Sequence, residues 1–259
     1  MEDTRAWFDA TGPIEAPTLV FLHGAAWTRA MWRPQVERLS GMFHVMALDL
    51  PGHGALAGEP FRLNTAIEHI EQALDICHRA RAVVVGLSLG GYVAMAYAAR
   101  YPERCAGLAL SGCCIEYRGL IGALSALDAT ISTRLYGARR LEAMQRESVR
   151  KTYPPALADP QFNAGFFFQA MPAVYSELAR QRFQPLLQKY PGPSLIINGE
   201  HDKLNRRGEA RLLAAAQHGE LRIIANAGHL CNLDQPESFT EAMQAFARFP
   251  YLRNSAPSK

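Results

Sequence analysis

The most constraining feature of the sequence is a short apolar run that ends in the pattern Gly-x-Ser-x-Gly. Residues 83–87 have the β-branched character of a buried parallel strand, and an alanine-rich helical stretch follows Ser88. A strand that turns directly into a helix holds the residue between them in a strained conformation, with its side chain exposed. The two backbones pass closest at Gly86 and Gly90, where only small residues fit. We therefore predict that Ser88 stands above the carboxyl edge of a parallel sheet, at the N-terminus of a helix.

The rest of the chain alternates between predicted strands and helices. Short apolar runs predict further strands at residues 18–22, 43–48, 107–110, 194–197 and 221–225, with a short edge strand over Arg5–Ala10. Helical patterns separate these strands, and Thr65-Ala66-Ile67-Glu68 has the form of a capping box, which predicts that a helix begins there. This alternation predicts the α/β fold class, with a doubly wound, mostly parallel sheet and right-handed crossovers. A chain of 259 residues is long enough to bury a full core in one such domain.

The alternation stops between residues 115 and 190. This stretch has amphipathic helical patterns and a proline-rich break at Tyr153-Pro154-Pro155, but no good buried strand. A stretch this long between two strands of one sheet must fold on its own or lie over the edge of the sheet. We therefore expect a core formed by residues 1–114 and 191–259, with residues 115–190 as a helical insertion between two core strands.

Three polar residues follow predicted strands in positions that suit catalysis. A serine hydroxyl is a poor nucleophile at neutral pH, so Ser88 requires a base, and the base requires a group that orients it. Asp202 and His229 each follow a strand, so we expect them with Ser88 at the carboxyl edge of the sheet. The chain order Ser, Asp, His is the one expected for this architecture. The alternatives are a solvated loop carboxylate at Asp202 and a surface histidine at His229.

Together these motifs resemble those of the α/β-hydrolase family, over nearly the whole chain apart from the extreme termini and residues 115–190. The matching motifs are the nucleophile elbow Gly86-Leu87-Ser88-Leu89-Gly90-Gly91, the oxyanion loop His23-Gly24, the turn Asp49-Leu50-Pro51-Gly52-His53-Gly54, the acid loop Gly199-Glu200-His201-Asp202 and the histidine loop Gly228-His229. The resemblance implies the α/β-hydrolase fold, with the insertion where the family has its helical cap. Some members carry the acid in the loop before the cap, but residues 111–114 here contain no carboxylate, which favours Asp202.

The resemblance also implies a role for each residue of the site. Ser88 would attack a carbonyl carbon, and His229 would take the serine proton and later deliver it to the leaving group. Asp202 would hold the tautomer of the imidazole and stabilise the imidazolium. The backbone N–H groups of Ala25 and Leu89 would bind the developing oxyanion.

Other polar residues in these loops have structural interpretations. His23 and His53 are expected to hold loops by hydrogen bonds, and Asp49 is expected to cap its own turn. Asp234 remains a second candidate for the acid because it follows His229 closely, although its position suits a helix cap.

Aromatic and thioether side chains mark a candidate substrate pocket. These are Trp27, after the first core strand, and Phe166, Phe167, Phe168 and Met171 in the expected cap. Such side chains offer large apolar area and adaptable shape, which suits an acyl or aryl group. The alternative is that the phenylalanines form only the core of the cap.

We expect a serine hydrolase that cleaves carboxylic esters of small apolar acyl or aryl groups through an acyl-enzyme. Family members that open epoxides or displace halide resemble one another in carrying Asp at the nucleophile position, so Ser88 disfavours both activities. The elbow also resembles that of enol-lactone hydrolases. The alternatives on the same triad are therefore lactone or enol-lactone hydrolysis, carbon–carbon bond hydrolysis and acyl transfer. The competing class is a non-catalytic receptor of the same fold that binds a small ligand.

The composition argues against several partners and cofactors. The net charge of +3 is small and scattered, which argues against a nucleic-acid or acidic-membrane partner. The five cysteines have no metal-ligand spacing, so we expect buried reduced thiols, including Cys113 and Cys114, with no metal and no cofactor. Residues Met1–Arg5 lack the apolar core of a signal peptide, and no stretch is long enough to cross a membrane. We expect a cytoplasmic monomer or homodimer that acts on a small-molecule ester or lactone.

Overall fold

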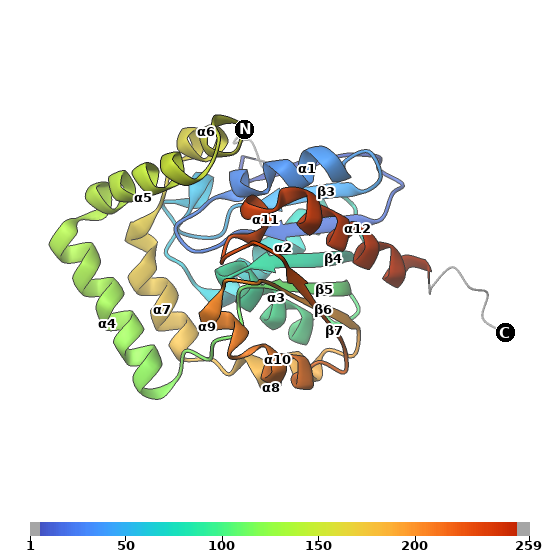
Figure 1. The fold of residues 1–259 in the computed structure, drawn as a ribbon. Coiled ribbons are helices and arrows are strands. Elements are labelled where there is room, and N and C mark those ends of the chain that lie inside the picture. The colour runs from blue at the N-terminus through green and yellow to red at the C-terminus, as the bar shows by residue number, and fades with distance from the viewer. Residues whose placement is uncertain (1–5, 253–259) are drawn as a thin grey trace.

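A seven-stranded sheet lies at the centre of the computed structural model, which describes residues 6–252 (Figure 1). Its strands are β1 (Phe8–Thr11), β2 (Thr18–Leu22), β3 (His44–Leu48), β4 (Ala82–Leu87), β5 (Cys105–Ser111), β6 (Pro193–Gly199) and β7 (His218–Ile224). They lie in the order β1-β3-β2-β4-β5-β6-β7, and every pair is parallel except β1 with β3. This arrangement confirms the predicted α/β fold class with a doubly wound, mostly parallel sheet.

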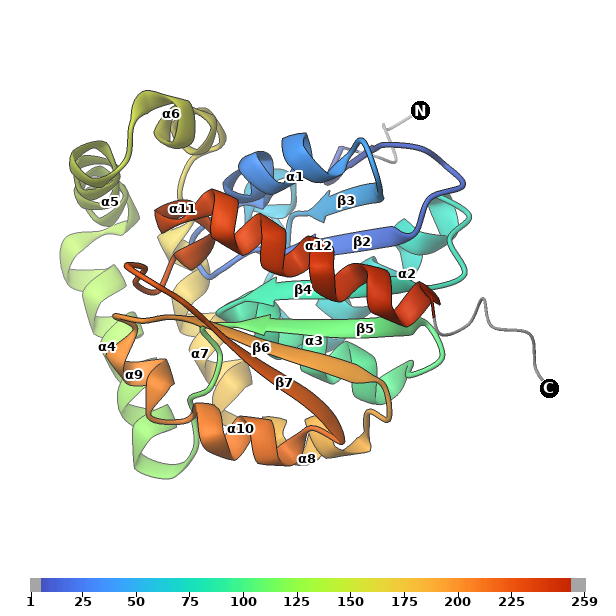
Figure 2. The ribbon, with the colours of Figure 1, turned by 45° about the vertical axis from the view of Figure 1, so that its right-hand side comes forward.

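Helices cover both faces of the sheet (Figure 2). One face carries α1 (Arg33–Leu39) and α12 (Pro236–Leu252), and the other carries α2 (Leu63–Ile76), α3 (Leu89–Arg100), α8 (Phe183–Lys189) and α10 (Glu209–Ala215). In β2, Leu19 and Phe21 belong to the apolar cluster under α12, whereas Val20 and Leu22 belong to the cluster under α3. Successive side chains of a strand point to opposite faces, so a run that is apolar at every position requires a helical layer on each side.

The segment between β5 and β6 is helical. It contains α4 (Gly119–Tyr136), α5 (Ala138–Thr152), α6 (Pro155–Ala164), η3 (Phe168–Ala170), α7 (Met171–Ala179) and α8, and no strand lies within residues 115–190. The helices α4 to α7 lie beyond the carboxyl ends of the strands, with α4 packed along α7 (Figure 2). In contrast, α8 packs against α3, so the end of the insertion belongs to the helical layer on the sheet.

Short helices occupy the loops at the carboxyl edge of the sheet. They are η1 (Arg29–Trp32), η2 (Gly54–Leu56), α9 (Lys203–Arg206) and α11 (Cys231–Asp234). Within residues 6–252, no helix combines the length and the apolar composition that a bilayer span requires.

The edge strand predicted over Arg5–Ala10 is observed with shifted bounds. It forms β1, which begins at Phe8 and pairs antiparallel with β3. Residues 1–5, to which the signal-peptide prediction refers, lie outside the described part of the chain.

The predicted start of α2 is wrong by three residues, since the N-cap is Arg62 and not Thr65. The helix begins at Leu63, before the capping box at Thr65, and the residue ahead of it makes no side-chain cap. Instead, Glu177 of α7 accepts a hydrogen bond from the Leu63 N–H at 3.1 Å. A carboxylate beside a helix N-terminus satisfies a free N–H and interacts favourably with the helix dipole. The start of α2 is therefore set by a tertiary contact, which local sequence cannot reveal.

Candidate active site

Ser88 occupies the sharp turn between β4 and α3. Its φ of +53° and ψ of −114° lie outside the regions that non-glycine residues favour. Its N–H donates to the carbonyl of Ser111, at the end of β5, at 2.7 Å. The Ser88 side chain remains half-buried, whereas Leu87 and Leu89 on either side are buried. The turn thus presents the hydroxyl at the carboxyl edge of the sheet.

Close backbone approach on both sides holds this turn in place. A Cβ atom at Gly86 would lie 2.2 Å from the carbonyl oxygen of Gly90. A Cβ atom at Gly90 would lie 2.1 Å from the carbonyl oxygen of Leu22, at the end of β2. Because no side chain fits at either position, the glycines allow β2, β4 and α3 to converge beneath Ser88.

Asp202 and His229 meet at the same edge of the sheet. Nδ1 of His229, in the loop after β7, lies 2.8 Å from Oδ2 of Asp202, which follows β6. The Asp202 side chain is 7% exposed and that of His229 is 44% exposed, so the carboxylate is enclosed while the imidazole ring reaches solvent. The ring lies against Gly112, where a Cβ atom would be 2.8 Å from the ring Cε1. Gly112 directly follows Ser111, which binds the Ser88 N–H, so the ring lies close to the serine turn.

Asn205 supports the Asp202 carboxylate, and the sequence analysis missed it. Its Nδ2 donates to Oδ2 of Asp202 at 2.8 Å, and its backbone N–H donates to Oδ1 at 3.3 Å. Its Oδ1 accepts the Cys114 N–H at 2.8 Å, which ties α9 to the loop after β5. The sequence could have indicated the backbone contact, because Asp202 lies three residues before Asn205 in the position of a helix N-cap, and such a carboxylate accepts from the third helical N–H. The further bond from the amide side chain depends on the fold.

The pKa of Asp202 lies below its ordinary value. Burial alone would raise the pKa, but the hydrogen bond and charge of His229, with the hydrogen bonds from Asn205, favour the ionised form more strongly. The carboxylate is therefore negative at neutral pH and can orient the imidazole and stabilise its positive charge.

His23 and His53 are neutral and hold the loops around Ser88. Nε2 of His23 accepts the Leu50 N–H at 2.9 Å, and Nε2 of His53 accepts the Ala26 N–H at 3.1 Å. Each Nδ1 lies 2.8 or 2.9 Å from a backbone carbonyl, that of Gly24 or Pro51, to which it donates. Burial lowers the pKa of His23 to about 4 and that of His53 to about 3, which keeps Nε2 an acceptor. Both residues have the structural role expected from the sequence.

Asp49 joins two loops rather than capping only its own turn. It is buried, and it accepts hydrogen bonds from the backbone N–H groups of Arg29 and Ala55, both at 2.9 Å. The guanidinium of Arg29 also pairs with this carboxylate. The partly buried Arg29–Asp49 pair therefore adds to the histidine hydrogen bonds that hold the loops after β2 and β3 together.

Two backbone N–H groups beside Ser88 donate to no acceptor within the described part of the chain. They belong to Ala25, in the loop after β2, and Leu89, the first residue of α3. The loop lies against the serine, since a Cβ atom at Gly24 would be 3.6 Å from the Cβ of Ser88. Buried or half-buried backbone donors are nearly always paired in folded proteins, so free donors here are available to a bound group.

Asp234 ties the loop that carries His229 to the insertion. Its Oδ2 accepts the Gly228 N–H at 2.7 Å, and its Oδ1 accepts the hydroxyl of Tyr153 at 2.5 Å. It therefore holds the chain next to His229 and does not contact the ring through any hydrogen bond among the described residues. Tyr153 lies at the C-terminal end of α5, so the helical insertion and the histidine loop share this contact.

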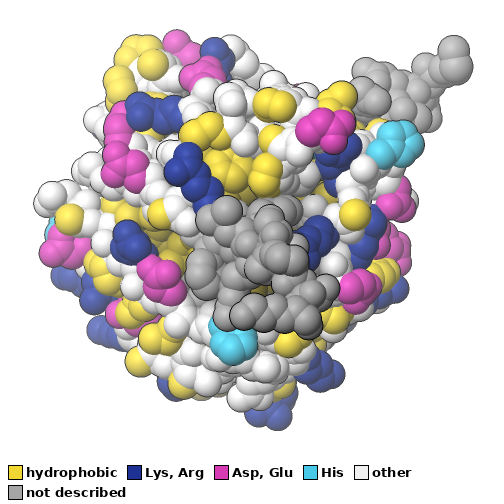
Figure 3. Space-filling model, turned by 90° about the vertical axis from the view of Figure 1, so that its right-hand side faces the viewer, with side chains coloured by type: hydrophobic (Ala, Val, Ile, Leu, Met, Phe, Trp, Pro, Cys, Tyr) yellow, Lys and Arg dark blue, Asp and Glu magenta, His cyan; other side chains and the backbone are white. Residues whose placement is uncertain are grey.

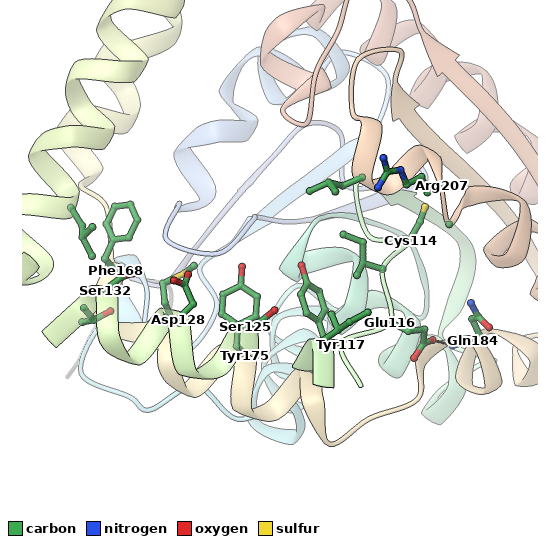
Figure 4. Close-up of a pocket in the computed structure, with 18 of the residues that line it drawn as sticks. Cys114, Glu116, Tyr117, Ser125, Asp128, Ser132, Phe168, Tyr175, Gln184 and Arg207 are labelled. Atoms are coloured by element: carbon green, nitrogen blue, oxygen red, sulfur yellow. Dashed lines mark hydrogen bonds between the residues drawn. The ribbon is translucent and has the colours of Figure 1, made fainter. Parts of the chain in front are cut away.

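A cavity of about 740 Å³ lies between α4, α7 and the loops after β5 and β6 (Figure 4). Of the five residues predicted for the substrate pocket, Phe168 and Met171 line this cavity, together with Tyr175. Its other apolar lining residues include Ile115, Ile121, Leu141 and Leu204. The tyrosines Tyr117 and Tyr175 form part of one wall, with ring centroids 5.3 Å apart.

The other three predicted pocket residues lie elsewhere. Phe166 is 4% exposed and packs edge-to-face on the buried Trp27, with ring centroids 5.1 Å apart. Phe167 donates its N–H to the Ala26 carbonyl at 2.8 Å, next to the loop with the free Ala25 N–H. Trp27, Phe166 and Phe167 thus bind the insertion to the loop after β2, which accords with the alternative that the phenylalanines form core.

The cavity lies beside the acid loop, and Ser88, Asp202 and His229 are not among its lining residues. Among its lining residues, Leu204 and Cys114 belong to the segments that Asn205 joins beside Asp202. At the other end of the cavity, the lining residue Phe168 directly follows Phe167, whose N–H is hydrogen-bonded to the loop after β2. The cavity therefore borders the acid loop, and one segment of its wall is joined to the loop beside Ser88.

The thiols near the site are unreactive. Burial raises the pKa of Cys114 to about 11 and that of Cys231 to about 12, and it also raises the pKa of Cys113. Thiols with such pKa values stay protonated at neutral pH and are poor nucleophiles and metal ligands. Within the described residues, no group of three or more His, Cys, Asp or Glu side chains is arranged to hold a metal ion.

Comparisons with known proteins agree with this architecture. The sequence profile of the alpha/beta hydrolase family matches residues 19–242. The chain is 27% identical to carboxylesterase YbfK of Bacillus subtilis (strain 168), covering 92% of this chain and 82% of that protein. It is 22% identical to 3-oxoadipate enol-lactonase 2 of Acinetobacter baylyi, covering 94% and 93%. The crystal structure of the enol-lactonase from Burkholderia xenovorans LB400 has a similar fold, with a TM-score of 0.78, 22% identity and coverage of 93% and 95%.

The support of Asp202 by Asn205 predicts a shift in acid stability. The stabilisation from ionised Asp202 is fully present above the ordinary carboxyl pKa of about 3.9 and is lost as the pH falls through the lower folded-state pKa. Asn205→Ala removes one donor to the carboxylate, so the folded-state pKa rises and the loss of stability begins at a higher pH. Urea unfolding between about pH 2 and pH 6 measures this difference. Asn163→Ala, at an exposed position of α6, is the control, and superimposable acid profiles of wild type and Asn205→Ala would contradict the assignment.

Proposed function

The chain belongs to the alpha/beta hydrolase family, and we propose that it is a serine hydrolase of carboxylic esters with small apolar acyl or aryl groups. Ser88 is the nucleophile, His229 the general base and Asp202 the acid that orients the base. The observation that carries the proposal is the 2.8 Å contact between Nδ1 of His229 and Oδ2 of Asp202, beside the strained Ser88 turn.

The mechanism follows from the protonation states of the pair. Nδ1–H of His229 donates to the ionised Asp202, which leaves Nε2 as the acceptor for the Ser88 hydroxyl proton. Attack of Oγ on the ester carbonyl forms a tetrahedral intermediate, and the imidazolium then protonates the leaving alcohol. Water, deprotonated by His229, hydrolyses the acyl-enzyme and restores Ser88.

Ala25 and Leu89 supply the proposed oxyanion hole. Their backbone N–H groups lie next to Ser88 and donate to no acceptor in residues 6–252, which supports this role. Leu89 is also the first residue of α3, whose positive dipole end favours a developing negative charge. Donors of this kind typically contribute about 3–4 kcal/mol each to the transition state.

The proposed substrate pocket is the cavity beside the helical insertion, with α4 to α7 as the cap. Phe168, Met171 and Tyr175 give it a largely apolar lining, which suits an acyl or aryl group. Trp27 and Phe166 do not line this cavity, and their packing joins the insertion to the loop after β2. A cytoplasmic location remains part of the proposal, and the five cysteines, none of which forms a disulfide in the described residues, support it.

Lactone or enol-lactone hydrolysis is the second candidate for the same triad. The sequence similarity to 3-oxoadipate enol-lactonase 2 supports this candidate. The chemistry at Ser88 is the same, and the difference is that a lactone gives one product molecule. Parallel assays on p-nitrophenyl esters and enol-lactones distinguish the two candidates.

Replacement of the proposed nucleophile tests the function directly. Ser88→Ala should lower turnover of p-nitrophenyl acetate by at least about 10³-fold, because the acyl-enzyme can no longer form. Ser148→Ala, at an exposed position of α5, is the matched control and should retain full activity. Near-normal turnover by folded Ser88→Ala protein would overturn the mechanism, and no turnover by the wild type on any ester or lactone would favour the receptor class.

The pocket assignment predicts that two neighbouring phenylalanines behave differently. Phe168→Ala should change the ratio of kcat/KM between octanoate and acetate esters by up to roughly 100-fold, since it alters the cavity wall. Phe166→Ala should leave this ratio unchanged and lower the free energy of unfolding by about 3–5 kcal/mol, because it leaves a hole against Trp27. Steady-state kinetics and denaturant unfolding of both variants provide the measurements. An unchanged chain-length profile in Phe168→Ala contradicts the pocket.

A further inference from the structure

The outer face of α4 is an apolar surface without a partner in the described chain. Five aliphatic side chains on this helix are exposed by 44% to 74%: Leu120, Leu124, Leu127, Ile131 and Leu135. Their spacing of three or four residues places them on one side of the helix. The opposite side, with Gly122 and Ala129, is buried, and α4 packs there along α7. The exposed stripe therefore faces away from the protein. The helix α4 itself lies at the outer edge of the insertion (Figures 1 and 2).

The substrate cavity does not account for this stripe. A third side of α4, with Ser125, Asp128 and Ser132, lines the cavity (Figure 4). None of the five stripe residues is among the cavity's lining residues. Removing several aliphatic side chains from water would be favourable, and contiguous exposed apolar surface of this kind marks a binding site.

Basic side chains flank the stripe. Arg118 and Arg134 at the two ends of α4, and Arg139 and Arg140 at the start of α5, are exposed and form no ion pair with any described residue. The carboxylate on α4, Asp128, lies on the cavity side. On the opposite side of the molecule, acidic and basic side chains are interspersed (Figure 3). Apart from Asp128 on the cavity side, the charged residues beside the stripe are thus basic.

We propose that the outer face of α4 docks on a membrane surface that contains anionic phospholipid. A helix with an aliphatic face and flanking arginines has the chemistry of an interfacial helix, which lies in the plane of the lipid headgroups. The arginines would contact lipid phosphates while the leucines enter the acyl boundary. A second copy of this chain fits less well. A two-fold contact between α4 helices would bring Arg118 and Arg134 of the two copies together, and like charges across an interface are costly.

Docking would place the cavity at the lipid surface. Ile121 of α4 and Leu204 of α9 both line the cavity and are both exposed, so they lie at its mouth. Arg207 and Arg211, exposed at the same mouth, extend the basic rim. The entry of a membrane-dissolved ester by this route rests on the proposed function, whereas docking itself does not.

Vesicle binding by the full-length chain tests the proposal. Cosedimentation is measured with phosphatidylcholine vesicles that contain or lack phosphatidylglycerol, over a range of NaCl concentrations. Leu124→Gln/Leu127→Gln removes two side chains from the stripe without altering the cavity. Ile14→Gln/Met42→Gln replaces two exposed apolar residues elsewhere and is the matched control. Arg139→Gln/Arg140→Gln tests the basic rim.

The proposal predicts salt-sensitive binding to the anionic vesicles and little binding to phosphatidylcholine alone. Leu124→Gln/Leu127→Gln should weaken binding by at least roughly tenfold, Arg139→Gln/Arg140→Gln should weaken it measurably, and the control should bind like the wild type. All variants should hydrolyse a soluble ester at the wild-type rate, so a failure of the proposed function is separable from a failure of docking. Absent wild-type binding, or equal binding by the stripe variant, overturns the proposal. The proposal is also overturned if the wild type binds no vesicles and is a dimer that Leu124→Gln/Leu127→Gln converts to a monomer.

Discussion

The strained turn at Ser88 is the constraint on which the rest of the site depends. A positive φ at a serine persists only where the surroundings hold it, and here three backbones converge at Gly86 and Gly90 with no space for a Cβ atom. The same convergence brings the loop after β2 against Ser88 and places the N–H of Leu89, the first residue of α3, beside the serine. A close packing of backbones thus places the half-buried Ser88 hydroxyl next to the Ala25 and Leu89 N–H groups, which have no acceptor among the described residues.

The charges of the site are distributed by burial and hydrogen bonding. Asp202 is enclosed yet ionised, because His229 and Asn205 donate to it. Burial keeps His23 and His53 neutral by lowering their pKa values, and Nε2 of each ring accepts a backbone N–H. Of these three histidines, His229 reaches solvent and is suited to proton transfer. The buried His23 and His53 hold the loops in place.

The sequence could predict the sheet and the proposed catalytic residues because each depends on local pattern. Buried parallel strands are apolar at every position, and the glycines around Ser88 mark a close approach that any strand–turn–helix of this kind requires. The start of α2, the role of Asp234 and the packing of Phe166 could not be predicted. Their partners, Glu177, Tyr153 and Trp27, lie far away in the chain.

The outer face of α4 shows a related limit of sequence analysis. This helix is apolar on several sides, so its periodicity could not reveal which side packs, which lines the cavity and which faces solvent. The expectation of no acidic-membrane partner rested on a net charge of +3 for the whole chain. That average conceals a local group of arginines beside leucines, and only the folded structure shows that these leucines are exposed.

Identification of the acylated residue tests the central claim most directly. The protein is mixed rapidly with p-nitrophenyl acetate, quenched in acid before steady state and digested, and the peptides are analysed by mass spectrometry. The account predicts one acetyl group on Ser88, formed together with one equivalent of p-nitrophenolate and at a rate no slower than turnover. Steady hydrolysis without an acetyl group at Ser88, or with the acetyl group on a different residue, would contradict it.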